Sequence, residues 1–99
     1  MTEHAHVIQI TTFTARDGRF DDLTQATRPF VQLATDADGC FGAQLCTIAE
    51  APDVVAIVSR WRDQAALDEF VSEHPDAGQP ADELVAQGPT NLHYAALRD

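Results

Sequence analysis

Residues 54–61 read Val-Val-Ala-Ile-Val-Ser-Arg-Trp, and only Ser59 and Arg60 in this stretch are polar. β-Branched and aromatic side chains favour an extended strand, and a strand this apolar is typical of one buried on both faces. A connection over residues 49–53, with Pro52, precedes the stretch, and Asp63 follows as a good helix N-cap. The stretch therefore predicts a central strand that leads directly into a helix.

On either side of this strand, segments with strand and helix periodicity alternate. Apolar residues keep helical spacing on both sides of Pro29, so we predict a single helix there. Proline has no backbone N–H, so this helix lacks one hydrogen bond. The resulting order, β-α-β-β-α-β with an extra helical turn before the last strand, is the ferredoxin-like pattern of an α+β domain with a four-stranded antiparallel sheet. One domain spans residues 1–99, with strands over 6–15, 40–48, 54–61 and 91–97 and helices over 19–35, 64–72 and 81–87.

Both faces of the predicted sheet carry apolar side chains. In the first strand, alternation places Val7 and Phe13 on one face and Ile8 and Ile10 on the other. Two helices can cover only one face of a four-stranded sheet. A second copy of the chain is the simplest cover for the other face, so the sequence predicts a homodimer.

The amino-acid composition argues against two classes of binding partner. The formal charge is -10, and all six basic residues are arginines against sixteen acidic ones. Such a surface argues against nucleic acid and anionic membranes as partners, because both require cationic contacts. No apolar run reaches the ~20 residues of a membrane span, and the N-terminal residues do not read as a signal peptide, so a cytoplasmic location is expected. Cys40 and Cys46, if on one strand, lie too far apart to bridge and are expected as buried free thiols.

Three local segments resemble the antibiotic biosynthesis monooxygenase family, and the resemblance covers about residues 6–97. These segments are A-R-D-G-R-F-D-D-L at 15–23, D-A-D-G-C-F-G-A-Q-L at 36–45 and V-S-R-W-R-D-Q-A-A-L-D-E-F at 58–70. Asp38 stands where the family pattern usually has Pro, and Ser59 stands where it has Glu. The resemblance implies a dimeric α+β barrel, a fold that hosts many functions.

The resemblance also implies a chemistry. Members of this family include oxygenases that use neither metal nor flavin, so no cofactor is expected. They oxidise aromatic phenols, quinols or polyketide-like substrates with O₂ in an apolar cavity between sheet and helices. A related branch degrades haem with an Asn, a Trp and a His. The matching positions here are Thr11, Phe70 and Pro80, so the resemblance speaks against haem degradation.

The candidate catalytic residues are histidines, because they are the side chains that exchange protons near neutral pH. His74, after the helix expected to roof the cavity, is the first choice for a general base, and His93 is the second. Either could instead be structural: His74 as an exposed loop residue and His93 as a sheet or interface residue. His4 and His6 lack a third ligand for a metal, and no metal site is expected.

The candidate substrate-binding residues lie on the predicted strands and on the second helix. Trp61 matches the aromatic of the family's strand-to-helix junction and could line the cavity or simply pack in the core. Gln9 and Thr11 are polar residues within an apolar strand, and they could orient a ligand or bond to a neighbouring strand or across the dimer. The full set is Gln9, Thr11, Ile57, Ser59, Trp61 and Phe70.

Three functions remain open from the sequence. The first is a cofactor-independent monooxygenase. The second is a non-catalytic dimeric barrel that binds a small hydrophobic metabolite or assists a partner enzyme, favoured by the missing Glu before the Arg-Trp pair. The third is an isomerase, cyclase or dehydratase of the same fold.

Overall fold

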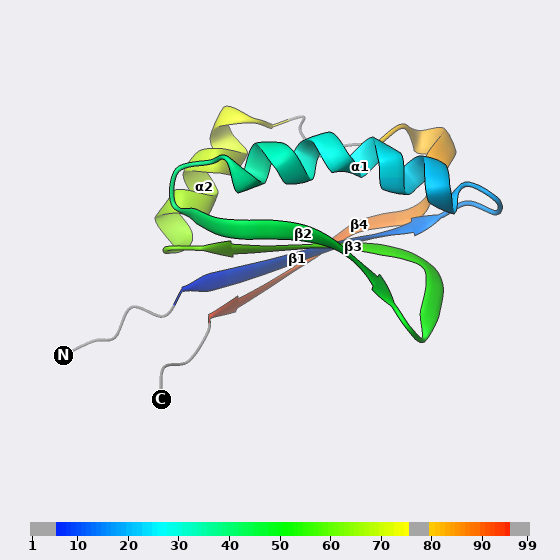
Figure 1. Cartoon of the computed structure of the whole chain (residues 1–99), viewed down its shortest axis with the longest axis horizontal. Coiled ribbons are helices and arrows are strands. Elements are labelled where there is room, and N and C mark those ends of the chain that lie inside the picture. The colour runs from blue at the N-terminus through cyan, green and yellow to red at the C-terminus, as the bar shows by residue number, and fades with distance from the viewer. Residues whose placement is uncertain (1–5, 76–79, 96–99) are drawn as a thin grey trace.

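The computed structural model describes residues 6–75 and 80–95. It confirms the predicted βαββαβ order and the ferredoxin-like α+β fold (Figure 1). A single turn of 3₁₀ helix, η1, precedes the last strand. The elements are β1 (Val7–Ala15), α1 (Phe20–Thr35), β2 (Cys40–Ile48), β3 (Ala51–Trp61), α2 (Gln64–Glu73), η1 (Asp82–Leu84) and β4 (Val85–Ala95).

The four strands form one antiparallel sheet in the order β2-β3-β1-β4. The predicted central strand, β3, therefore lies between β2 and β1. Gln9 of β1 is opposite Ser59 of β3 on one side and His93 of β4 on the other. The first and last strands are thus neighbours, which brings residues more than eighty positions apart to the same part of the sheet.

Both helices cover the same face of the sheet, as Figure 1 shows. Asp63 caps α2 as predicted, because its carboxylate accepts a hydrogen bond of 2.8 Å from the backbone N–H of Ala66. The covered face holds two buried clusters. One packs Trp61, Leu67 and Phe70 with their neighbours, and the other packs residues from β1, α1, β3 and η1: Phe13, Ala15, Leu23, Val55, Ile57 and Leu84.

Two predicted boundaries around β3 and β4 are wrong. The strand β3 begins at Ala51 rather than at residue 54, because Ala51 already pairs with Ile48 of β2. Pairing with β1 starts only at Val54, so Pro52 does not have to supply an N–H to β1. The predicted helix over 81–87 is only the turn η1, and β4 already starts at Val85. The predicted end of the last strand, at residue 97, lies outside the described residues.

The reason for the second error is long-range pairing. Val85 and Gln87 pair with Ala15 and Thr14 of β1, and Leu84 is buried in the core. The strand continues past Gly88, which has φ of +117° where the register with β1 shifts. A Cβ there would lie 2.8 Å from the backbone oxygen of Thr12, so glycine lets the strand stay close to β1 at this irregularity.

Within the described residues, no helix lies over the other face of the sheet. The register places Ile10 of β1 beside Val58 of β3 and Leu92 of β4 on this face. Leu92 is 54% exposed and Tyr94 is 50% exposed. We call this surface, made of Ile8, Ile10, Val58, Leu92 and Tyr94, the open face. It confirms the expectation that apolar residues lie on both sides of the sheet.

Three further expectations concern the described part of the chain. Cys40 and Cys46 both lie on β2 as free thiols, but they are half-buried rather than buried. Over residues 6–75 and 80–95, no helix has the length and apolar character needed to cross a bilayer. The same residues contain no cluster of three or more His, Cys, Asp or Glu side chains that could hold a metal ion. His4 lies outside the described residues.

Candidate functional site

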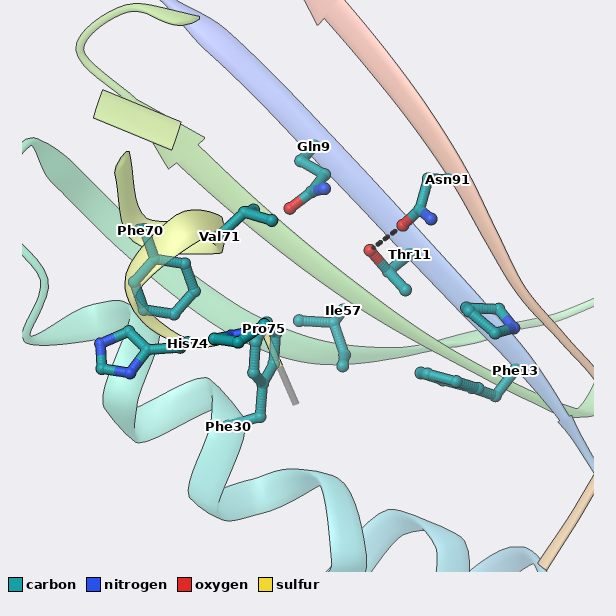
Figure 2. A pocket seen from close by; sticks show the side chains of 11 residues that line it. Gln9, Thr11, Phe13, Phe30, Ile57, Phe70, Val71, His74, Pro75 and Asn91 are labelled. Atoms are coloured by element: carbon teal, nitrogen blue, oxygen red, sulfur yellow. Dashed lines mark hydrogen bonds between the residues drawn. The ribbon is translucent and has the colours of Figure 1, made fainter. Parts of the chain in front are cut away.

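A cavity of about 160 Å³ lies between the helices and the covered face of the sheet. Its apolar wall comes from the two helices and from the middle of β1 and β3, and Figure 2 shows these side chains converging on it. It is about as large as an engineered cavity known to hold benzene, so it accommodates roughly one aromatic ring. The lining residues are Gln9, Thr11, Phe13, Phe30, Ile57, Phe70, Val71, His74, Pro75, Pro89 and Asn91.

The sheet side of the cavity carries two polar pairs between β1 and β4. Thr11 Oγ1 donates a hydrogen bond of 2.7 Å to Asn91 Oδ1, drawn as a dashed line in Figure 2. Gln9 Nε2 lies 3.2 Å from His93 Nε2. With the amide nitrogen as the donor, His93 accepts through Nε2 in the tautomer that carries its proton on Nδ1. The polar residues of β1 therefore have their partners on the neighbouring strand.

His74 lies at the opposite side of the cavity, at the C-terminal end of α2. Its backbone N–H donates to the carbonyl oxygen of Phe70 at 3.0 Å, and its ring packs on the Phe70 ring with centroids 4.9 Å apart. No side-chain hydrogen bond joins His74 to another described residue, so its ring nitrogens can meet a ligand. In Figure 2 its ring lies beside the Phe70 ring, at the end of the site far from Asn91 and Thr11.

The structure brings five of the predicted site residues to the cavity wall: Gln9, Thr11, Ile57, Phe70 and His74. Trp61 and Ser59 do not line it. Trp61 is 1% exposed, donates from Nε1 to Ser59 Oγ at 2.9 Å, and packs against Phe70 with ring centroids 5.1 Å apart. Trp61 therefore packs behind Phe70 rather than on the cavity wall.

His93 lies in an adjoining groove rather than in the cavity itself. This groove, of about 410 Å³, runs between α2 and β4 and is formed with Leu67, Asp68 and Ser72. It shares Gln9, Val71 and Asn91 with the cavity. The two spaces are therefore adjacent, and Gln9 and Asn91 stand where they meet.

Asn91 is the main cavity residue that the sequence interpretation missed. It was placed only as the first residue of a strand. The available signal was its alternation with His93, which puts both side chains on one face. That signal points to a site only once β4 is known to pair with β1, because the pairing sets Asn91 opposite Thr11. Phe30 and Val71 fit the apolar stripes of their helices and Phe13 fits an apolar face of its strand, and such patterns indicate core packing rather than a site.

These features define a class: a ferredoxin-like α+β domain with a ring-sized cavity between its helices and its sheet. A sequence profile described as antibiotic biosynthesis monooxygenase matches residues 6–75. The chain belongs to the antibiotic biosynthesis monooxygenase family. No curated protein matches the chain.

Several solved structures share the fold. A protein from Pseudomonas aeruginosa is 20% identical with a TM-score of 0.77, over 99% of this chain and 100% of that chain. A proposed antibiotic biosynthesis monooxygenase from Bordetella bronchiseptica is 21% identical with a TM-score of 0.76, over 95% and 99% of the two chains. Another proposed monooxygenase of this name, from Nitrosomonas europaea, reaches a TM-score of 0.82 at 10% identity, over 98% and 95%. At these identities the likeness concerns the fold.

Proposed function

We propose that the protein is a cofactor-independent monooxygenase that oxidises an aromatic phenol, quinol or polyketide-like substrate with O₂. The observation that carries this proposal is the cavity itself. It combines an apolar, ring-sized space with one histidine, His74, whose ring nitrogens have no partner among the described residues. Family membership supports the same reaction class.

In this proposal His74 acts as the general base. A neutral imidazole removes the proton of an acidic phenolic group, or of the ring carbon conjugated with it, and the resulting anion is electron-rich enough to react with O₂. Apolar walls from Phe30, Ile57 and Phe70 hold the ring and exclude water, which favours reaction over protonation of the anion from solvent.

The reaction balances without a further reductant. The anion gives electrons to O₂ and forms a carbon–oxygen bond. The resulting peroxide loses its outer oxygen as water, together with the hydrogen of the attacked carbon. One oxygen atom of O₂ becomes a ring carbonyl and the other becomes water, while the substrate loses two hydrogens and gains one oxygen. Oxygen is thus the only co-reactant that the step needs.

The test is oxygen uptake with anthrone as the probe substrate, in chelator-treated protein. The expected product is anthraquinone, with one labelled atom when ¹⁸O₂ is supplied. His74→Ala should lower turnover by about 10²–10⁴-fold, the usual contribution of a general base. His6→Ala is the matched control, because His6 packs against Phe41 away from the cavity. Binding of anthrone without an oxygen-dependent product would contradict the proposal and favour a non-catalytic binding protein.

The roles of the two histidines can be separated in the same assay. His93 acts through Gln9, so His93→Ala should lower turnover less than His74→Ala. A large loss in His93→Ala with none in His74→Ala would overturn the assignment of the base. A product formed equally well without O₂ would instead indicate an isomerase, cyclase or dehydratase.

We also propose that the functional unit is a homodimer joined through the open face. The open face is apolar, contains large exposed side chains, and belongs to the same sheet whose other face carries the cavity. Covering it with a second copy removes apolar surface from water, at about 25 cal/mol per Å².

A further inference from the structure

A second apolar space, separate from the cavity, lies between α1 and β2. Figure 1 shows α1 lying over β2 and running in the opposite direction. The space between them has a volume of about 250 Å³, and we call it the α1–β2 groove. Its walls are Phe20, Thr24, Arg28, Leu45, Cys46, Thr47 and Val55. None of these residues lines the cavity at His74 or the groove beside α2, so this is a distinct space.

The floor of the α1–β2 groove is part of the packed core. Val55 is 1% exposed, and Phe20 and Leu45 pack against the same buried cluster. The groove opens at the edge of the sheet, because β2 is the outermost strand on that side. It also lies on the helix-covered face, so a dimer joined through the open face leaves it accessible. The groove thus offers a fixed apolar surface to a molecule from solvent.

The rim of the groove carries one cation. Of the described residues that line it, only Arg28 is charged. The chain has sixteen acidic residues, and Arg19 and Arg62 pair with Asp22 and Asp63. Over residues 6–75 and 80–95, Arg28 forms neither an ion pair nor a side-chain hydrogen bond. Its guanidinium therefore keeps five N–H donors for an external acceptor.

The helix wall of the groove separates this charge from the apolar end. Phe20, Thr24 and Arg28 follow at intervals of four, so they lie along one side of α1. Eight residues of helix place Arg28 about 12 Å from Phe20 along the axis. The Thr24 hydroxyl donates to the Phe20 carbonyl oxygen at 2.9 Å, so it keeps no proton for a ligand. The groove therefore fits a molecule with one anionic end and an apolar body.

We propose that the α1–β2 groove binds an amphipathic monocarboxylate, with its carboxylate on Arg28 and its hydrocarbon chain over Leu45, Val55 and Phe20. The planar guanidinium fork matches a carboxylate through two parallel hydrogen bonds. A chain of about eight carbons spans most of the distance from Arg28 to Phe20. No acidic side chain is among the described lining residues, and charges beyond about 8 Å are screened at physiological salt. The inference does not rest on the proposed function, since His74 is not involved.

The test compares octanoate with octanol, which has the same chain without the charge, by amide NMR spectra at about 0.15 M salt. Octanoate should shift the amides of Thr24, Arg28 and Leu45 saturably. It should bind about threefold to tenfold tighter than octanol, the range for a favourable charge pair at a partly exposed site. Arg28→Gln should remove this preference and leave octanol binding unchanged. Arg62→Gln, which loses the same charge beyond the far end of β3, is the matched control and should keep the preference.

Thr24→Glu is a second variant that keeps the cation but supplies its own carboxylate. A Glu four residues before an Arg pairs with it on a helix, so α1 should stay folded while Arg28 becomes occupied. The preference for octanoate should then disappear, with the midpoint of urea unfolding close to that of the wild type. The inference is overturned if Arg28→Gln keeps the wild-type preference, or if the octanoate shifts fall on the residues of the His74 cavity instead of the α1–β2 groove.

Discussion

At the scale of single residues, Ser59 holds the buried indole of Trp61 by a hydrogen bond and does not line the cavity. The indole N–H donates to the Ser59 hydroxyl at 2.9 Å, and both residues are buried. The sequence correctly identified the junction Trp and its place on the same face as Ser59. It could not decide between core and cavity wall, because that depends on how α2 places Phe70 between Trp61 and the cavity.

Ser59→Ala should destabilise the protein by about 1–2 kcal/mol, because it leaves a buried N–H without an acceptor. Urea unfolding at a fixed protein concentration would measure the change. Ser72→Ala, at an exposed position of α2, is the control and should have almost no effect. Equal stability of Ser59→Ala and the wild type would show that the indole finds another acceptor.

At the scale of elements, local patterns predicted most helices and strands, and the failures occurred where pairing at a distance overrides them. The stripe from Phe20 to Ala34 was sufficient for α1, because its spacing repeats over four turns of helix. Residues 81–87 carry only two large apolar side chains, Leu84 and Val85, and their conformation is set by β1, which is distant in the sequence. The same dependence explains why Asn91 was not recognised as a site residue.

The helix α1 lacks one backbone hydrogen bond at Pro29. Proline supplies no N–H to the preceding turn, and Pro29 is exposed, so its ring adds little packing. In the turns before Pro29, the Thr24 hydroxyl donates to the carbonyl oxygen of Phe20 and the Thr27 hydroxyl donates to that of Thr24, each at 2.9 Å.

Pro29→Ala should therefore raise the free energy of unfolding by about 1–3 kcal/mol, since it restores one backbone hydrogen bond in an element that packs on the core. The readout is the midpoint of thermal or urea unfolding. Arg28→Ala, one position away and also exposed, should change stability far less. A loss of stability in Pro29→Ala would mean that the proline conformation is needed for α1 to lie across the sheet.

At the scale of the whole molecule, the main physical feature is the imbalance between an apolar sheet with two faces and helices that cover one. This imbalance could be inferred from the alternation in the first strand and from the apolar run at residues 54–61. The cavity could not be located that way, because its walls come from β1, β3, β4 and both helices, whose relative placement no local pattern specifies.

The homodimer is tested by the mass of the protein in solution, measured by light scattering. The wild type should have twice the mass of one chain at micromolar concentration. Leu92→Glu places a charge on the open face in both copies of a symmetric interface, and should raise the dimer dissociation constant at least about hundredfold. Leu33→Glu, on α1 with 37% exposure, is the control. A wild-type protein that is monomeric under these conditions would contradict the dimer.

The groove beside α2 has a kinetic consequence. It meets the cavity at Gln9, Val71 and Asn91, and Val71 is 50% exposed. A small aromatic compound can thus travel from solvent to His74 along the flank of the sheet while the secondary structure stays in place. Uptake should then be a single fast phase that rises linearly with ligand concentration, without the plateau that a slow opening step would impose.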